Sequence, residues 1–198
     1  MKFEVFFDYL CPFVYRASVL LQNVGASGER TLEIGWRYFS LTQVNAKDDG
    51  WTVWDAPESD QVRGRLAFKA AEAARRQDHF DAFHKALLQA RHRDRLDIDE
   101  VAIVEQVAVE SGLDLKRFRK DIADPEIIRA LARDHELAVS EHDIFGTPTF
   151  LFPDGAAAYV RLAEVLSGAD AERAFKRIVS IVVDEPHILE IKRPTKTR

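Results

Sequence analysis

Hydrophobic and polar positions follow two different periods along the chain, and the first stretch has the short period of strands. Phe3–Phe7 and Leu32–Tyr38 are rich in aromatic and β-branched residues, which predicts two strands. Between them, Pro12–Val24 is compatible with a helix that the turn-forming sequence Gly25–Gly28 would close. A strand, a helix and a strand in this order predict a right-handed crossover between two parallel strands.

The middle of the chain, from about Gln61 to Val139, has the longer period of helices. Phe80, Phe83 and Leu87 fall on one helical face. Residues that typically begin helices mark the expected start of three more: Asp97–Glu100, Asp114 and Asp124. The preceding residues, 42–60, are expected to form an irregular loop. We predict an all-helical subdomain over residues 61–139, inserted into an αβ frame.

The strand period returns after Gly146. Phe150–Phe152 and Ala157–Val160 flank Pro153–Gly155, which predicts a hairpin. A last helix is expected from about Asp170 to Val183. The order is therefore βαβ, helical insertion, ββα. The predicted fold class is α/β, with residues 1–60 and 140–198 forming one domain around the helical subdomain.

The chain has one cysteine, Cys11, at a position that suits a reactive thiol. It follows a predicted strand and precedes a predicted helix, whose unpaired N–H groups and positive dipole end would stabilise a thiolate. Pro12 suits the first helical turn, where a missing N–H costs little. An inert, buried cysteine is the alternative, because free cysteines are among the most buried residues. Position alone leaves both interpretations open.

A second motif, Phe145-Gly146-Thr147-Pro148-Thr149-Phe150, reads as a turn that opens into a strand, with Pro148 at its start. With the strand-Cys-Pro-helix sequence, the chain resembles the thioredoxin superfamily. It is most similar to the DsbA-like branch that includes FrnE and has 2-hydroxychromene-2-carboxylate isomerase and kappa-class glutathione transferase as relatives. The resemblance covers nearly the whole chain, through these stretches: Phe6–Tyr15, Ala82–Leu87, Phe145–Phe150 and, more weakly, Ser167–Ala169.

The resemblance implies a thioredoxin fold and a site around Cys11 as the catalytic residue. It implies a cis peptide bond between Thr147 and Pro148, facing Cys11. It also implies a substrate-binding surface, made by Pro12, Phe13, Tyr15, Thr147 and Pro148. Core packing is the alternative for Phe13, and packing on the first helix is the alternative for Tyr15.

The chain departs from the FrnE-like pattern at Val14. Those proteins usually carry Cys-Pro-Trp-Cys, and Val14 stands where the second cysteine would be. Because the chain has one cysteine, it cannot form an internal disulfide. The isomerase and transferase relatives usually carry serine at the position of Cys11, so this chain lies between the two patterns.

Three functions follow from these residues. The first is a monothiol thiol-disulfide oxidoreductase or disulfide isomerase, in which an external thiol such as glutathione resolves a mixed disulfide on Cys11. The second is a glutathione-dependent isomerase or transferase of the hydroxychromene or kappa type, which would keep much of its activity after Cys11→Ser. The third is a non-catalytic thioredoxin-fold binding module.

Composition narrows the setting of the protein. The 198 residues are 46% hydrophobic, which is enough for a sizeable core, and 33 acidic against 28 basic residues give a net charge of −5. This balance argues against a nucleic-acid partner. No stretch approaches a membrane span, and no export leader is visible. With one cysteine, these features predict a cytoplasmic protein whose partner is a disulfide-bearing protein or a small thiol; a homodimer is left open.

The remaining polar candidates are weaker. Asp8 is expected to cap a helix rather than to transfer a proton, and His84 is expected to be structural. The six histidines show no convincing ligand spacing, so no metal is predicted. No Gly-rich nucleotide motif follows a strand. No tightly bound cofactor is therefore expected, and glutathione is the candidate co-substrate.

Overall fold

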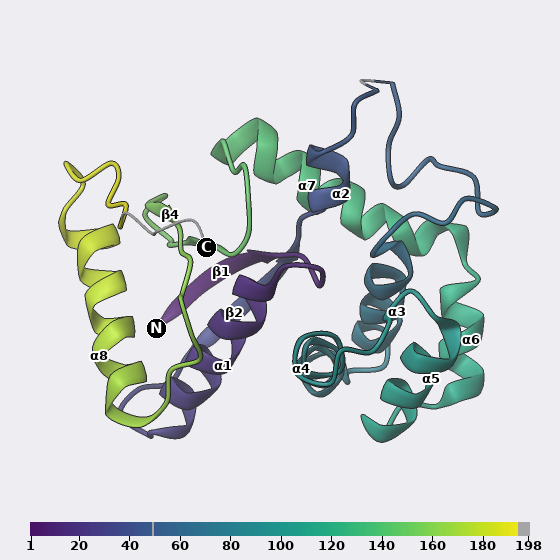
Figure 1. The fold of residues 1–198 in the computed structure, drawn as a ribbon, viewed down its shortest axis with the longest axis horizontal. Coiled ribbons are helices and arrows are strands. Elements are labelled where there is room, and N and C mark those ends of the chain that lie inside the picture. The colour runs from purple at the N-terminus through teal and green to yellow at the C-terminus, as the bar shows by residue number, and fades with distance from the viewer. Residues whose placement is uncertain (49, 194–198) are drawn as a thin grey trace.

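The computed structural model describes residues 1–193 with the exception of residue 49. Within these residues, four strands form one sheet in the order β2-β1-β3-β4 (Figure 1). The strands are β1 (Lys2–Phe7), β2 (Glu33–Tyr38), β3 (Thr149–Leu151) and β4 (Ala157–Tyr159). β1 is parallel to β2, whereas β3 is antiparallel to β1 and β4. The predicted parallel crossover and the predicted hairpin are confirmed.

Alternate residues of β1 serve the two faces of the sheet, as the period of a strand requires. Phe3 faces α1 (Pro12–Ala26) and α8 (Gly168–Val179), and its ring centroid lies 5.9 Å from that of Phe175 in α8. Phe6 belongs to a separate buried cluster on the other face, with residues of β3 and of α7 (Arg129–His142). The sheet is thus a central layer with α1 and α8 on one side and α7 on the other.

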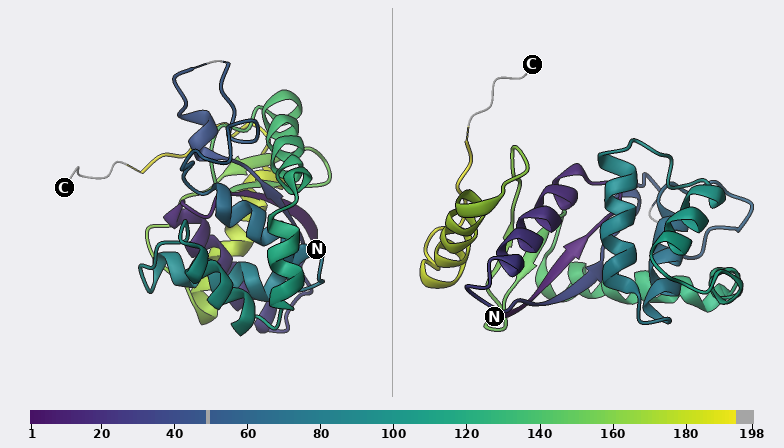
Figure 2. Two further views of the ribbon diagram at one scale, coloured as in Figure 1. Left: turned by 90° about the vertical axis from the view of Figure 1, so that its right-hand side faces the viewer. Right: turned by 90° about the horizontal axis from the view of Figure 1, so that it is seen from below.

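The helical insertion lies between β2 and β3 in the chain. In the right-hand view of Figure 2, its teal helices lie at the opposite end of the molecule from the yellow helix α8. Besides α7, it contains α3 (Arg65–Arg75), α4 (Phe80–His92), α5 (Val101–Glu110), α6 (Leu115–Ile122) and the 3₁₀ turn η1 (Pro125–Ile128). α3 packs against each of the other elements from α4 to η1, and α4 also contacts α1. The arrangement is a thioredoxin fold with a helical insertion, as expected. The division at residues 60/61 and 139/140 stays a prediction. The second part of the predicted domain was residues 140–198, of which residues 194–198 lie outside the described range.

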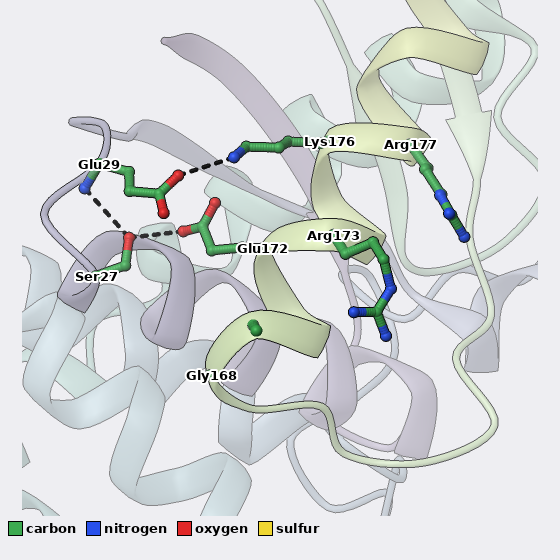
Figure 3. Close-up of a pocket in the computed structure, with 8 residues that line it drawn as sticks. Ser27, Glu29, Gly168, Glu172, Arg173, Lys176 and Arg177 are labelled. Carbon is green, nitrogen blue, oxygen red and sulfur yellow. Dashed lines mark hydrogen bonds and ion pairs between the residues drawn. The ribbon is translucent and has the colours of Figure 1, made fainter.

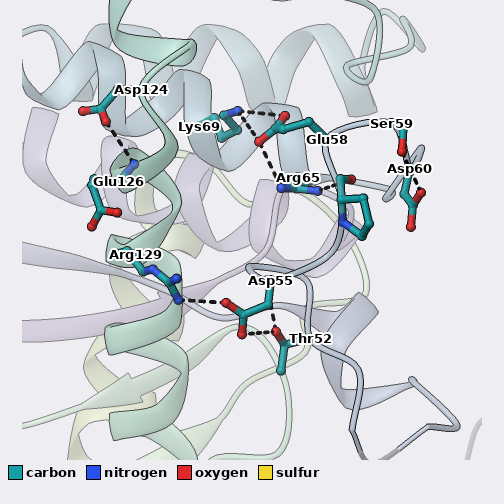
Figure 4. A network of polar contacts seen from close by, with 11 residues as sticks. Thr52, Asp55, Glu58, Ser59, Asp60, Arg65, Lys69, Asp124, Glu126 and Arg129 are labelled. Carbon is teal, nitrogen blue, oxygen red and sulfur yellow. Dashed lines mark hydrogen bonds and ion pairs between the residues drawn. The ribbon is translucent and has the colours of Figure 1, made fainter.

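The loop before the insertion is fastened to it by ion pairs (Figure 4). Glu58 accepts hydrogen bonds from Arg65 and Lys69 of α3, each at 3.0 Å. Asp55 accepts a hydrogen bond of 3.0 Å from Arg129 at the start of α7. The loop is therefore held against two helices of the insertion.

Three local features differ from the sequence expectations. Residues 42–60 are not wholly irregular, because the Ser40 hydroxyl accepts from Gln43 N and starts the short helix α2 (Leu41–Val44). Asp124 starts η1 rather than an α-helix, and α7 begins only at Arg129. The last helix changes after Val179 into a π-helical turn, η2 (Ser180–Asp184).

Candidate functional site

Cys11 is the residue at the boundary between the turn after β1 and helix α1. It is the N-cap of α1, with φ −84° and ψ 116°, and Pro12 takes the first helical position. Its N–H donates to the Asp8 carbonyl at 3.1 Å, and its own carbonyl accepts from Val14 N at 3.1 Å. The predicted place of Cys11 at a strand-to-helix junction is confirmed. The residue is buried, with 4% of its surface exposed.

The thiol of Cys11 faces the second sequence motif. Its Sγ donates a hydrogen bond of 3.2 Å to the carbonyl oxygen of Thr147, and the Thr147–Pro148 peptide bond is cis, as the resemblance implied. Two further bonds fix this loop: Thr149 Oγ1 donates to Gly146 O at 2.7 Å, and Val160 N donates to Pro148 O at 3.0 Å. The fold therefore brings Cys11, Thr147 and Pro148 together.

The other predicted site residues lie on the first turn of α1. Pro12 is exposed, and Phe13 is half-buried beside it. Tyr15 is also half-buried, but its ring stacks on His92 of α4 with centroids 5.8 Å apart. Pro12 and Phe13 thus follow the buried Cys11 and reach the surface, whereas Tyr15 faces the helical insertion. Val14 is fully buried.

Two aromatic residues next to the Thr147–Pro148 bond were not among the predicted site residues, although Phe145 belongs to the motif itself. Phe145 is 68% exposed, and its ring meets the ring of Tyr159 edge to face, with centroids 5.3 Å apart. Tyr159 packs so closely on Gly146 that a Cβ there would lie 3.3 Å from the ring. Burial raises the pKa of Tyr159, Arg161 lowers it, and Cys11 raises it further. The register between β3 and β4 places Tyr159 opposite Thr149, and no motif in the sequence predicts this pairing.

Sequence reasoning also missed two arginines on the ring of Phe13. The guanidinium carbon of Arg161 lies 4.1 Å from the ring centroid, and that of Arg16 lies 5.3 Å from it. Arg16 also donates to the carbonyl of Leu162 at 2.7 Å. Because Arg16 and Arg161 are 145 positions apart, their meeting follows from the fold and not from any local pattern.

Two histidines of α4 hold the turn that precedes Cys11. The hydroxyl of Tyr9 is hydrogen-bonded to His84 Nδ1 at 3.1 Å, and His92 Nε2 donates to the Tyr9 carbonyl at 2.8 Å. Burial, and secondarily the charge of Arg75, lowers the pKa of His84 to about 3, so this imidazole is neutral. The contacts of His84 agree with the structural role expected for it.

Asp8 lies beneath the same turn and is completely buried. Its two carboxylate oxygens accept from Leu10 N and Leu41 N, each at 2.7 Å. Burial, opposed by these two bonds, raises the pKa of Asp8 to about 6. Leu41 is the first residue of α2, so Asp8 accepts from one free N–H of that helix, whose N-cap residue is Ser40. No side chain caps α1, the helix that follows Asp8 in the chain.

A hollow that does not include the thiol lies between the end of α1 and the start of α8 (Figure 3). There Glu172 accepts from the Ser27 hydroxyl at 2.6 Å, and Lys176 donates to Glu29 at 2.8 Å.

Within the described residues, no three His, Cys, Asp or Glu side chains come together as metal ligands would. None of the helices formed by the described residues is long and apolar enough to cross a membrane.

A cysteine that starts the first helix of a thioredoxin fold and touches the Thr-Pro loop defines a DsbA-like thioredoxin-fold protein. The chain belongs to the family of DSBA-like thioredoxin domains, whose family model matches residues 2–180. An uncharacterized protein of Mycobacterium tuberculosis is 27% identical over 193 residues, covering 95% of this chain and 80% of that protein. The ClpXP adapter protein SpxH of Bacillus subtilis is 29% identical over 113 residues, which cover 57% of this chain and 37% of SpxH.

Solved structures share the fold. A probable DsbA oxidoreductase from Streptomyces coelicolor superposes with a TM-score of 0.63 at 19% identity, covering 100% of this chain and 94% of that one. The cytosolic disulfide reductase DsbM from Pseudomonas aeruginosa, solved with GSH, has a TM-score of 0.61 at 18% identity, covering 90% and 98%. A 2-hydroxychromene-2-carboxylate isomerase has a TM-score of 0.62 at 15% identity, covering 96% and 100%.

Proposed function

We propose that this protein is a monothiol thiol-disulfide oxidoreductase or disulfide isomerase that acts through Cys11. The observation that carries the proposal is the contact of 3.2 Å between Cys11 Sγ and the Thr147 carbonyl, at the N-terminus of α1. It places the one sulfur nucleophile of the chain beside a backbone loop that an extended substrate could join. Membership of the DSBA-like family supports a thiol-disulfide activity.

The reaction has two exchange steps. Cys11 loses its proton, and the thiolate attacks one sulfur of a disulfide R–S–S–R′, so that Cys11–S–S–R forms and R′–S⁻ leaves. An external thiolate then attacks the mixed disulfide and regenerates the Cys11 thiolate. When both R and the external thiol are glutathione, R′–S–SG and glutathione become R′–SH and glutathione disulfide. Electrons pass from glutathione to the substrate, and none is left on the protein.

The identity of residue 14 supports the need for an external thiol, because valine has no sulfur and the chain has one cysteine. Val14 lies one helical turn after Cys11, where a second cysteine would resolve the mixed disulfide, and it is fully buried. The resolving thiol therefore has to come from another molecule. Glutathione fits this role because it is small, and the structural relative DsbM was solved with GSH.

The proposed setting is the cytoplasm, where glutathione keeps thiols reduced. A protein with one cysteine has no internal disulfide to protect, and the relative DsbM is described as cytosolic. The proposed substrates are disulfide-bearing proteins or small disulfides. The proposed mechanism needs no homodimer, because every protein group that it uses comes from one chain.

The test is the reduction of 2-hydroxyethyl disulfide by glutathione, followed through the glutathione disulfide produced. Turnover that needs both the protein and glutathione, together with a mixed disulfide on Cys11 seen by mass spectrometry, is the expected result. Cys11→Ser removes the sulfur but keeps a hydroxyl that can donate to Thr147 O. Full activity in this variant would rule out the proposal.

A glutathione-dependent isomerase is the second candidate, favoured by Val14 and by the structural likeness to 2-hydroxychromene-2-carboxylate isomerase. In that case the sulfur of glutathione performs the chemistry and Cys11 only positions it. Isomerase activity that requires glutathione and survives Cys11→Ser would select this function.

A non-catalytic binding module is the third candidate, favoured by the 4% exposure of Cys11. Access to the sulfur decides between this candidate and the first. A Cys11 thiol that reacts with no alkylating reagent in the folded protein would select the binding role. Alkylation at a rate comparable with that of a free thiol would exclude it.

A further inference from the structure

Two guanidinium groups share one aromatic ring beside the proposed nucleophile. Arg161 lies 4.1 Å and Arg16 lies 5.3 Å from the centroid of Phe13, the second residue of α1. Each position allows a cation–π contact, which orients the cation but leaves its charge unneutralised. Both charges therefore lie at the end of the helix that begins with Cys11.

Neither cation is paired with a carboxylate in the described part of the chain. Arg16 is oriented by the carbonyl of Leu162, a neutral acceptor at 2.7 Å. Arg161 is exposed and keeps its N–H groups free for a ligand, because the described residues give it no hydrogen-bond acceptor or ion pair. The ring neutralises neither guanidinium, so an anion close to Phe13 would be attracted by both charges. The positive end of the α1 dipole adds to the same field.

The neighbourhood of Arg161 connects this charge to the sulfur. Tyr159 lies two residues before Arg161. Val160, between them, donates to Pro148 O at 3.0 Å, and Thr147, the residue before Pro148, accepts from Cys11 Sγ at 3.2 Å. The ring of Tyr159 packs on Gly146, next to Thr147. The side chain of Thr147 is buried, and its Oγ1 has no hydrogen-bond partner among the residues that the structure describes. A ligand bound to Arg161 would thus lie beside the Thr147–Pro148 loop, which contacts the Cys11 thiol.

We infer that Arg161, assisted by Arg16, selects disulfides that carry a carboxylate near the reacting sulfur. The substrate class is a glutathionyl mixed disulfide, in which carboxylates flank the cysteine sulfur at both ends of the tripeptide. This inference rests on the proposed function and deepens it. Arg161 would bind the anionic part of the substrate while Cys11 attacks the glutathionyl sulfur. An acidic protein segment next to a disulfide has the same chemistry, so the substrates tested must separate these sources.

The experiment compares the alkylation of Cys11 by iodoacetate, an anion, and by iodoacetamide, its neutral counterpart. The ratio of the two rates reports the local potential and cancels changes in thiolate population or access that affect both reagents. We expect Arg161→Gln to lower this ratio by about threefold or more and Arg161→Lys to restore most of it. Arg133→Gln is the matched control, because Arg133 is also exposed and lies on α7, across the sheet from α1.

The outcomes separate the inference from the proposed function. Alkylation by both reagents, with a ratio that does not change in Arg161→Gln, overturns the inference and leaves the function standing. Failure of both reagents to alkylate the wild-type protein overturns both. In turnover with 2-mercaptoethanol in place of glutathione as the external thiol, Arg161→Gln should raise KM for glutathionylated peptides but not for 2-hydroxyethyl disulfide or the cationic disulfide cystamine. An increase for an acidic peptide disulfide alone would assign the site to protein segments and overturn the choice of glutathione.

Discussion

Cys11 and Thr147 are 136 positions apart in the sequence, and a hydrogen bond of 3.2 Å joins the thiol of one to the carbonyl oxygen of the other. The carbonyl accepts a proton that a thiolate no longer has. Ionisation of Cys11 therefore breaks this bond and frees the carbonyl of Thr147. In the proposed reaction, the sulfur becomes nucleophilic and the loop gains a free acceptor in the same event.

Replacement of the sulfur is expected to abolish thiol-disulfide exchange. Cys11→Ser should lower the glutathione-dependent rate by at least about 100-fold, because a neutral hydroxyl is a far weaker nucleophile than a thiolate. Its hydroxyl can still donate to Thr147 O, so the free energy of unfolding should change by less than about 1 kcal/mol. Steady-state kinetics and urea denaturation measure the two quantities. A parallel loss of rate and of stability would attribute the effect to misfolding.

A second cysteine on the next helical turn should convert the mechanism. In Val14→Cys the two Cα atoms are separated by one turn of helix, about 5–6 Å, which is within reach of a disulfide. The variant should lose two hydrogens on oxidation, and its turnover should depend less on external thiol. Intact-protein mass spectrometry and a glutathione titration test this. Val14→Ala is the control, because it removes similar packing without adding a thiol; the same kinetic change there would contradict the explanation.

The buried carboxyl of Asp8 should make the protein less stable as pH rises. Burial raises its pKa from 3.8 to about 6, so between these values the folded state holds a proton that the unfolded state has released. The stability that this proton contributes is present below about pH 4 and is lost as pH rises through 6. The full change is about 2–3 kcal/mol, because one pKa unit corresponds to about 1.4 kcal/mol.

Asp8→Asn isolates this contribution because an amide does not ionise. Wild-type and variant should be compared by urea denaturation at pH 4.5 and pH 7.5. The wild-type protein should lose stability relative to Asp8→Asn over that interval, whatever the absolute cost of the lost backbone bond. A difference between the two proteins that is constant with pH would show that Asp8 titrates normally in the fold.

His84 should have the opposite effect on the pH dependence. Its pKa is lowered from 6.5 to about 3, chiefly by burial, so only the unfolded state takes up a proton as pH falls from 7 to 4. Stability is lost over that range. His84→Phe keeps an aromatic ring in the space between Phe7, Trp36 and Phe80 and should remove this loss. Unfolding free energies at pH 7 and pH 5 test the sign; an equally steep loss in His84→Phe would contradict it.

The hydrogen bond between Tyr9 and His84 can be measured in the same series. Tyr9→Phe leaves the buried Nδ1 of His84 without its partner and should cost about 1–3 kcal/mol at pH 7.5. In the double variant with His84→Phe, the cost should be smaller by about 1 kcal/mol. Additive effects of the two substitutions would mean that the bond contributes nothing to stability.

The local parts of this fold and site were open to prediction from the sequence. The strand and helix periods identified the four strands and the helical insertion, and the strand-to-helix step located Cys11. The Ser40-x-x-Gln43 sequence is a capping-box signal for α2 that was missed at the start of the stretch 42–60, which was interpreted as a loop. Arg161 and Tyr159 could not be found in this way, because β4 pairing alone brings them to Phe13 and Gly146. Contacts across a sheet register leave no pattern in the linear sequence.

The hydrogen bonds from α4 to Tyr9 mean that the helical insertion cannot be deleted without affecting the turn before Cys11. His84 and His92 hold the side chain and the main chain of a residue only two positions before Cys11. Strand β1 leads into the turn before α1, but the contacts that hold this turn in place come from α4 of the insertion. A shortened protein without the insertion would lose both contacts to Tyr9, and with them the support for the position of the Cys11 thiol. The helical insertion between β2 and β3 is therefore part of the structure that positions Cys11.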